Sequence, residues 1–157
     1  MINLVKITDY ITEDLIDLNL VASNKSEVLN ALSVLISKSP NIGENREAVH
    51  KALVEREKLG STGIGKGVAI PHAKSDTVKG LTIAFGKSEH KIDFKSLDNE
   101  GVNIFFVFAS PNKDSQIYLK VLARISRLIR EEDFRKELLM CKNSKEVIEC
   151  ISKREIS

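Results

Sequence analysis

The chain has 157 residues, of which 42% are apolar and 29% are charged, and its formal net charge is +2. This length and mixture suit one soluble globular domain, which we expect to extend over residues 1–157. The nearly balanced charge and the 5% aromatic content without tryptophan argue against a nucleic-acid-binding protein.

The sequence carries no membrane or export signal that we can identify. No run approaches the roughly 20 apolar residues of a transmembrane helix. The first ten residues lack the basic region, long apolar run and small-residue cleavage site of a signal peptide. Cys141 and Cys150 have a spacing that matches no common zinc or redox motif. We therefore expect a cytoplasmic protein with reduced cysteines that do not carry phosphate.

The N-terminal part of the chain predicts one short strand and two helices. Residues 16–21 suit an edge strand, and Asn24 with a glutamate three residues later is typical of a helix N-terminus. Apolar residues then recur at helical spacing as far as Pro40, which disfavours continuation. A second helix is predicted over residues 44–58, with Gly60 as a left-handed cap.

The middle of the chain predicts strands. The glycine-rich residues 60–67 cannot form a regular helix, and residues 68–70 and 82–85 have the composition of buried strands. Residues 102–109 are almost continuously apolar, which is typical of a central strand covered on both faces.

Helical periodicity returns in the C-terminal part, over residues 114–130. Two shorter helices are predicted over residues 132–140 and 144–152, the second capped by Ser144. Helices before, between and after strands indicate an α/β fold, a single-domain sandwich with a central mixed β-sheet flanked by helices. The pattern does not determine the strand order.

The candidate chemistry lies in the segment REKLGSTGIGKGVAIPH, which runs from Arg56 to His72. Its glycines allow main-chain N–H groups to approach a ligand closely. Pro71 fixes its own backbone and keeps Ile70 extended, so His72 should leave the strand end in a defined direction. α/β proteins usually place their chemistry at such strand ends.

Two nucleotide-binding motifs can be excluded for the glycines of this segment. They lack the spacing of the GxxxxGK[ST] phosphate loop, and they do not open a strand–glycine–helix unit of the dinucleotide type. We therefore expect no bound nucleotide, and these motifs give no sign of a cofactor.

An imidazole is suited to carry a phosphoryl group, because its ordinary pKa of about 6.5 leaves a neutral nitrogen at cellular pH. Arg56 could neutralise the phosphate through a bidentate fork, or it could only stabilise the end of its helix. Ser61 and Thr62 could donate hydroxyl hydrogen bonds to the phosphate, or they could bond the loop backbone. Both pairs of alternatives remain open.

The same segment closely resembles the active site of IIA phosphotransferase proteins of the fructose–mannitol class, which the nitrogen-regulatory IIA proteins share. The resemblance extends over nearly the whole chain. It implies that His72 is the phosphoacceptor and that Arg56 is the active-site arginine of the family.

The resemblance also implies the partners. The donor would be the phosphocarrier HPr, or its nitrogen-branch counterpart, and the acceptor a IIB domain, often at a cysteine. The membrane would be involved only indirectly, through a IIC component, and no metal or nucleotide would be needed. Sugar uptake and nitrogen-branch regulation use the same histidine, so they remain alternatives. The sugar and the oligomeric state are open.

One position departs from the family pattern. Many members carry a second active-site histidine in the helix that follows the long central strand, and the matching residue is Tyr118. A phenol can hydrogen-bond a phosphate or the imidazole of His72, but it does not become cationic at neutral pH. Simple packing is the alternative for Tyr118. His50 is expected on the surface, and His90 could replace the missing histidine only if its charged turn folds over the site.

Overall fold

The computed structural model describes residues 5–113 and 115–155 of the chain. Within them one mixed six-stranded sheet has the order β1-β5-β6-β3-β2, with β4 also paired to β6. Strands β5 and β6 are antiparallel, whereas β3 and β4 both run parallel to β6. The strands are β1 (Ile16–Asp17), β2 (Gly63–Gly65), β3 (Val68–Ala69), β4 (His72–Lys74), β5 (Thr82–Ile92) and β6 (Val102–Ser110).

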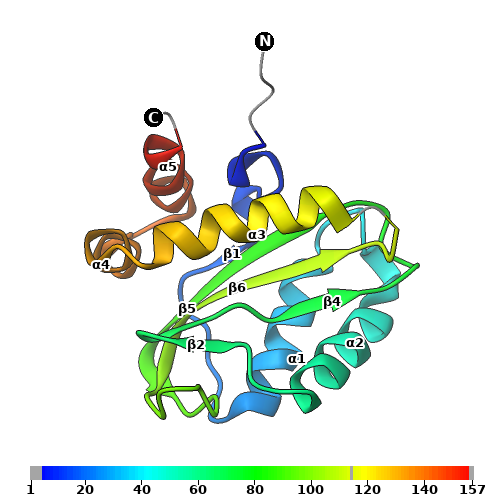
Figure 1. Ribbon diagram of the computed structural model, residues 1–157, viewed down its shortest axis with the longest axis horizontal. Helices are drawn as coiled ribbons and strands as arrows, with labels where there is room; N and C mark the ends of the chain where they lie inside the picture. The colour runs from blue at the N-terminus through cyan, green and yellow to red at the C-terminus, as the bar shows by residue number, and fades with distance from the viewer. Residues whose placement is uncertain (1–4, 114, 156–157) are drawn as a thin grey trace.

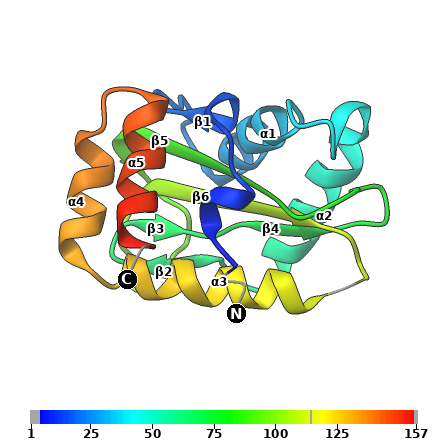
Figure 2. The same ribbon diagram turned by 90° about the horizontal axis from the view of Figure 1, so that it is seen from above.

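Helices cover both faces of this sheet. Helices α1 and α2 lie on one face, and α3, α4 and α5 lie on the other (Figures 1 and 2). This arrangement confirms the predicted α/β sandwich with a central mixed sheet. The helices are α1 (Lys25–Ile36), α2 (Arg46–Lys58), α3 (Ser115–Ile129), α4 (Glu132–Met140) and α5 (Ser144–Arg154).

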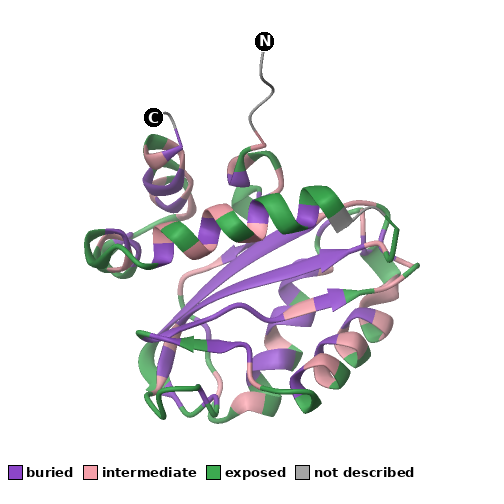
Figure 3. Ribbon diagram, viewed as in Figure 1, coloured by how far each residue is buried: buried purple, intermediate pink, exposed green. Residues whose placement is uncertain are grey.

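Strand β6 is the centre of the hydrophobic core, and it is buried along nearly its whole length (Figure 3). Ile104, Phe106 and Phe108 pack on the α3 side of the sheet. Phe105 and Val107 point to the opposite side, toward α1 and α2. Side chains of a strand alternate between its two faces, so one apolar run fills both cores. The prediction of a central strand here is confirmed.

The helix caps agree with the prediction at α1 and differ at α2 and α5. The Asn24 side chain accepts a hydrogen bond from the Glu27 N–H over 2.9 Å, which caps α1 as expected. Helix α2 ends where predicted, but Gly60 has a φ of 151°, far from the left-handed helical conformation that we expected for its cap. At α5 the cap is Asn143 and not Ser144, because Asn143 has extended backbone angles and accepts from the Glu146 N–H over 2.9 Å.

The ends of other elements also bear on the prediction, since β1 covers only Ile16–Asp17 of the residues 16–21 expected there. The predicted start of α3 at Asp114 lies outside the described residues. Strand β5 continues to Ile92, so the charged run around His90 is part of a strand and not a turn. No helix in residues 5–113 and 115–155 has the length and apolar character that crossing a membrane requires.

The chain between β3 and β4 follows β6 with one interruption. Pro71 has no N–H to donate, yet its carbonyl oxygen accepts from the Phe108 N–H over 2.9 Å. Pairing with β6 then resumes, with His72 opposite Phe108. His72 is therefore the first residue of a new short strand, rather than a residue that leaves the end of the previous one.

Candidate functional site

The direction of the His72 side chain follows from strand alternation. Ala69 and Ala73 belong to the core beneath α1 and α2, whereas Ile70 belongs to the core beneath α3. His72 therefore points to the α3 side. Its ring lies 5.9 Å from the ring of Tyr118 in α3, measured between centroids, and it is half-buried.

Both ring nitrogens of His72 have hydrogen-bond partners. Nδ1 lies 3.1 Å from the carbonyl oxygen of Ile70, which can only accept. Nε2 lies 3.0 Å from Nε of Arg56, which can only donate. A neutral imidazole satisfies both contacts only with its proton on Nδ1 and its lone pair on Nε2. The surroundings of His72 thus select the tautomer whose Nε2 is nucleophilic.

Arg56 reaches His72 from the opposite helical layer. It stands in the last turn of α2, and its NH1 donates to the carbonyl oxygen of Gly60 over 2.8 Å. One guanidinium therefore joins α2, the glycine-rich loop and the imidazole. This contact with His72 favours the active-site interpretation of Arg56 over that of a solvated helix end.

The surroundings also lower the pKa of His72 below its ordinary value of 6.5. Burial is the main cause, because it disfavours the charged ring. The bond to the Ile70 carbonyl opposes this effect, and the nearby charge of Arg56 adds to it. His72 is consequently neutral at neutral pH.

The two candidate hydroxyl groups are occupied within the loop. Ser61 Oγ donates to the carbonyl oxygen of Phe94 over 3.0 Å and accepts from the Gly63 N–H over 3.0 Å. The hydroxyl of Thr62 donates to the carboxylate of Glu57. These bonds favour the loop-building alternative for Ser61 and Thr62, and neither hydroxyl is bonded to His72.

Glu57 is a residue of this site that the sequence reasoning missed. The residue is 9% exposed, and its carboxylate accepts from the Thr62 N–H over 3.1 Å. It also pairs with Nζ of Lys25 at 2.7 Å, which ties the loop to both α1 and α2. A signal existed, since Glu57 follows Leu53 by four residues and so continues the buried face of the helix.

Tyr118 is packed between the site and the core. It is 5% exposed, and its ring contacts that of Phe108 at a centroid distance of 5.8 Å. Burial raises the pKa of its hydroxyl, so it remains a neutral phenol. Tyr118 thus lies beside His72, as its position in the chain predicts.

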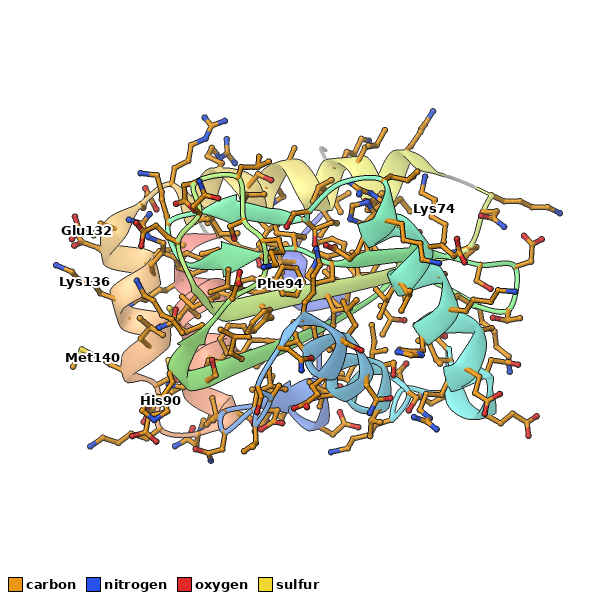
Figure 4. All side chains as sticks on the ribbon, turned by 90° about the horizontal axis from the view of Figure 1, so that it is seen from below. Lys74, His90, Phe94, Glu132, Lys136 and Met140 are labelled. Carbon is orange, nitrogen blue, oxygen red and sulfur yellow. The ribbon has the colours of Figure 1, made fainter. Side chains whose placement is uncertain are left out.

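His90 does not reach the site. Ile83 of β5 and His72 of β4 both lie opposite Phe108, on the two sides of β6. His90 lies seven residues after Ile83 in β5. Seven strand residues span about 23 Å. Figure 4 accordingly shows His90 and Lys74 of β4 at opposite ends of the molecule. His90 therefore does not meet the condition for replacing the missing histidine. His50, expected on the surface, is half-buried.

The remaining candidates for ligand or phosphate chemistry are accounted for as follows. Residues 5–113 and 115–155 contain no group of three or more histidine, cysteine or acidic side chains placed to hold a metal ion. Cys141 and Cys150 are buried, and burial raises the pKa of the Cys150 thiol to about 12. A thiol of this kind is not a nucleophile at neutral pH.

A known protein family matches nearly the whole of this chain. Residues 9–154 match the family described as "Phosphoenolpyruvate-dependent sugar phosphotransferase system, EIIA 2". The chain belongs to this family, which confirms the resemblance found in the sequence.

Relatives of two kinds are similar to the chain. The fructose-specific EIIABC component of Bacillus subtilis (strain 168) is 34% identical over 150 residues, which are 96% of this chain but 24% of that protein. The chain thus spans about a quarter of the length of that relative. The nitrogen regulatory protein of Bradyrhizobium diazoefficiens is 36% identical over 132 residues, 84% of this chain and 85% of that protein.

Solved structures give the same picture. The nitrogen regulatory protein IIA-Ntr from Neisseria meningitidis is 27% identical with a TM-score of 0.86, and the match covers 92% of this chain and 98% of that one. The IIA mannitol protein of Escherichia coli, in a complex with phosphorylated IIB, has a TM-score of 0.77 at 19% identity, over 91% of this chain and 97% of that one. The second likeness concerns the fold alone.

Proposed function

We propose that this protein is a phosphoryl carrier of a phosphoenolpyruvate-dependent sugar phosphotransferase system, which accepts phosphate on His72 from HPr and passes it to a IIB component. One observation carries the proposal. The contacts with Ile70 and Arg56, at 3.1 and 3.0 Å, hold His72 in the neutral tautomer whose Nε2 has a lone pair.

The proposed transfer exchanges one P–N bond for another. The Nε2 lone pair forms a bond to phosphorus while the P–N bond of the donor phosphohistidine breaks. The donor imidazole keeps that electron pair and leaves as a neutral ring, provided that its other nitrogen carries a proton. His72 retains its proton on Nδ1, so its phosphorylated ring is cationic, and the Ile70 carbonyl stabilises that charge.

Arg56 has two roles in this step. Its Nε–H occupies the Nε2 lone pair of His72 before transfer, so the guanidinium must move aside when phosphorus arrives. The same cation then neutralises the phosphoryl oxygens. Phosphoryl transfer depends mainly on such positioning and charge neutralisation.

In the onward step, a cysteine thiolate of the IIB partner attacks phosphorus. The P–Nε2 bond breaks and returns its electron pair to Nε2, which restores the starting tautomer. A mannitol IIA protein of similar fold has been solved in a complex with phosphorylated IIB, which supports a IIB acceptor.

Contact with the membrane would be indirect, through a IIC component, and the expected compartment is the cytoplasm.

The second candidate is a nitrogen-branch regulator that binds its targets according to its phosphorylation state. The chain matches 85% of the length of the Bradyrhizobium nitrogen regulatory protein. Both candidates require the same chemistry at His72, so they differ in partners and not in mechanism.

The test is incubation with phosphoenolpyruvate, enzyme I and HPr, followed by intact-mass and phosphohistidine analysis. We expect one acid-labile phosphate on the wild type and on His90→Ala, and none on His72→Ala. Phosphate on folded His72→Ala would refute the proposal. A wild type that accepts phosphate only from the nitrogen-branch counterpart of HPr would select the regulatory candidate, and acceptance from neither donor would refute both.

A further inference from the structure

Lys74 lies on the same face of β4 as His72. The two residues are separated by one position of a strand, and side chains two apart point to the same side. Nζ of Lys74 lies 4.9 Å from the ring centroid of Tyr118, the ring that His72 also contacts. Tyr118 therefore has an imidazole and an ammonium group as neighbours.

The site contains positive charge that the described residues do not neutralise. The ion pairs found in residues 5–113 and 115–155 involve neither Arg56 nor Lys74. The nearby carboxylate of Glu57 is paired with Lys25. Two cations near one nucleophile suit a group that arrives with its own negative charge.

Tyr118 can hold the ammonium of Lys74 close to His72. A cation over an aromatic face is attracted by the negative face of the ring quadrupole. The ring itself is fixed, because it is buried against Phe108. A lysine has a flexible stem and a compact charge, so it can leave the ring for a phosphoryl group nearby.

We propose that Lys74, held over Tyr118, contacts the phosphoryl group on His72 and supplies the second positive charge of the site. This inference rests on the proposed function. It also accounts for Tyr118 at the position of the second family histidine. A neutral tyrosine cannot supply a positive charge, but its ring can position the ammonium group of Lys74. Lys74 adds to Arg56 and does not replace it.

The first test compares the rate of phosphoryl acceptance and the lifetime of phosphohistidine among variants of the full chain. Lys74→Gln should lower the rate about 10- to 100-fold and shorten the lifetime, the range expected for a lost hydrogen bond to a charged group. Lys74→Arg should retain most of both. Lys120→Gln, which removes an exposed lysine from α3, is the control and should behave as the wild type.

The second test examines whether the aromatic ring of Tyr118 positions Lys74. Tyr118→Phe keeps the aromatic face and should retain the rate, whereas Tyr118→Leu should approach Lys74→Gln. The double variant Tyr118→Leu/Lys74→Gln should be no slower than Lys74→Gln alone, because both changes remove one contact. A Tyr118→Phe variant as slow as Tyr118→Leu would refute the claim that the aromatic ring positions Lys74.

A third readout separates this inference from the proposed function. In the unphosphorylated protein, the pKa of His72 measured by NMR should rise in Lys74→Gln, since the charge of Lys74 lowers it. A wild type that takes phosphate on His72, together with a Lys74→Gln variant of unchanged rate and lifetime, refutes the inference and leaves the function intact. A wild type that takes no phosphate refutes the function itself.

Discussion

Nε of Arg56 donates to Nε2 of His72 over 3.0 Å, so the guanidinium covers the atom that would accept phosphorus. The other end of Arg56 is anchored, because its NH1 donates to the Gly60 carbonyl oxygen over 2.8 Å. The resting site is thus closed by a cation that a phosphoryl group can attract away from the imidazole. This relationship determines the first two predictions.

Arg56→Lys should lower the rate of phosphoryl acceptance about 10- to 100-fold. A lysine keeps the charge, but it cannot contact Gly60, His72 and a phosphate with one planar fork. The rate is measured with phosphorylated HPr in rapid-quench experiments. Arg46→Lys, at the opposite end of α2, serves as the control. An Arg56→Lys variant as fast as the wild type would reduce Arg56 to a residue of the helix end.

The pH dependence of His72 should be displaced to the acid side. Burial and Arg56 lower its pKa below 6.5, so the neutral nucleophile persists as the pH falls through 6.5 and is lost only at lower pH. NMR titration of the ring protons measures this value. Arg56→Gln should raise it, because one of the causes that lower it is removed. A wild-type value at or above 6.5 would contradict the burial that the structure gives His72.

Glu57→Gln should lower the free energy of unfolding by about 2 kcal/mol and slow phosphoryl acceptance. The carboxylate holds Thr62 and pairs with Lys25, and removal of one partner leaves the others unsatisfied. The loss is limited, because the Lys25 side chain is 21% exposed and can reach water. Urea denaturation measures the change.

Glu55→Gln is the matched control for Glu57→Gln. Glu55 stands in the same helix, and its pair with Lys58 is 3.8 Å long and 59% exposed at the glutamate. The control should therefore change the free energy of unfolding by less than about 0.5 kcal/mol. Equal effects of the two substitutions would mean that the buried contacts of Glu57 do not hold the loop.

Asn143→Ala should cost about 1 kcal/mol of stability, whereas Ser144→Ala should be nearly neutral. Only the Asn143 side chain caps α5, through its bond from the Glu146 N–H. Thermal or urea unfolding of the two single variants distinguishes them. A larger loss in Ser144→Ala would restore the cap that the sequence pattern suggested.

Much of the fold could be predicted because its signals are local. The apolar run of β6 and the helical periods of α1 and α3 depend only on residues near one another in the chain. The Asn24 cap is also local, since donor and acceptor are three residues apart. At the start of α5, Asn143 and Ser144 are both suitable capping residues, and the predicted cap was one residue too late.

The resemblance of the segment from Arg56 to His72 indicated both residues as candidates for the phosphoryl chemistry, but their contact at 3.0 Å is seen only in the folded chain. The sequence could not decide what the hydroxyls of Ser61 and Thr62 bond, since Phe94 and Glu57 approach them only in the folded chain. The sequence likewise does not indicate that Lys74 lies close to Tyr118, because β4 and α3 are distant in the chain.

Lys87 shows most clearly what only the tertiary structure decided. It stands in β5 and is 8% exposed, yet its ammonium donates to the carbonyl oxygens of Leu138, Leu139 and Cys141 at the end of α4. Residues about 50 positions apart meet there because the sheet and the helices pack face to face. Local patterns thus determined the elements of this protein and indicated its candidate phosphoacceptor. Packing decided which polar groups meet, because burial leaves each of them only the partners that the fold brings near.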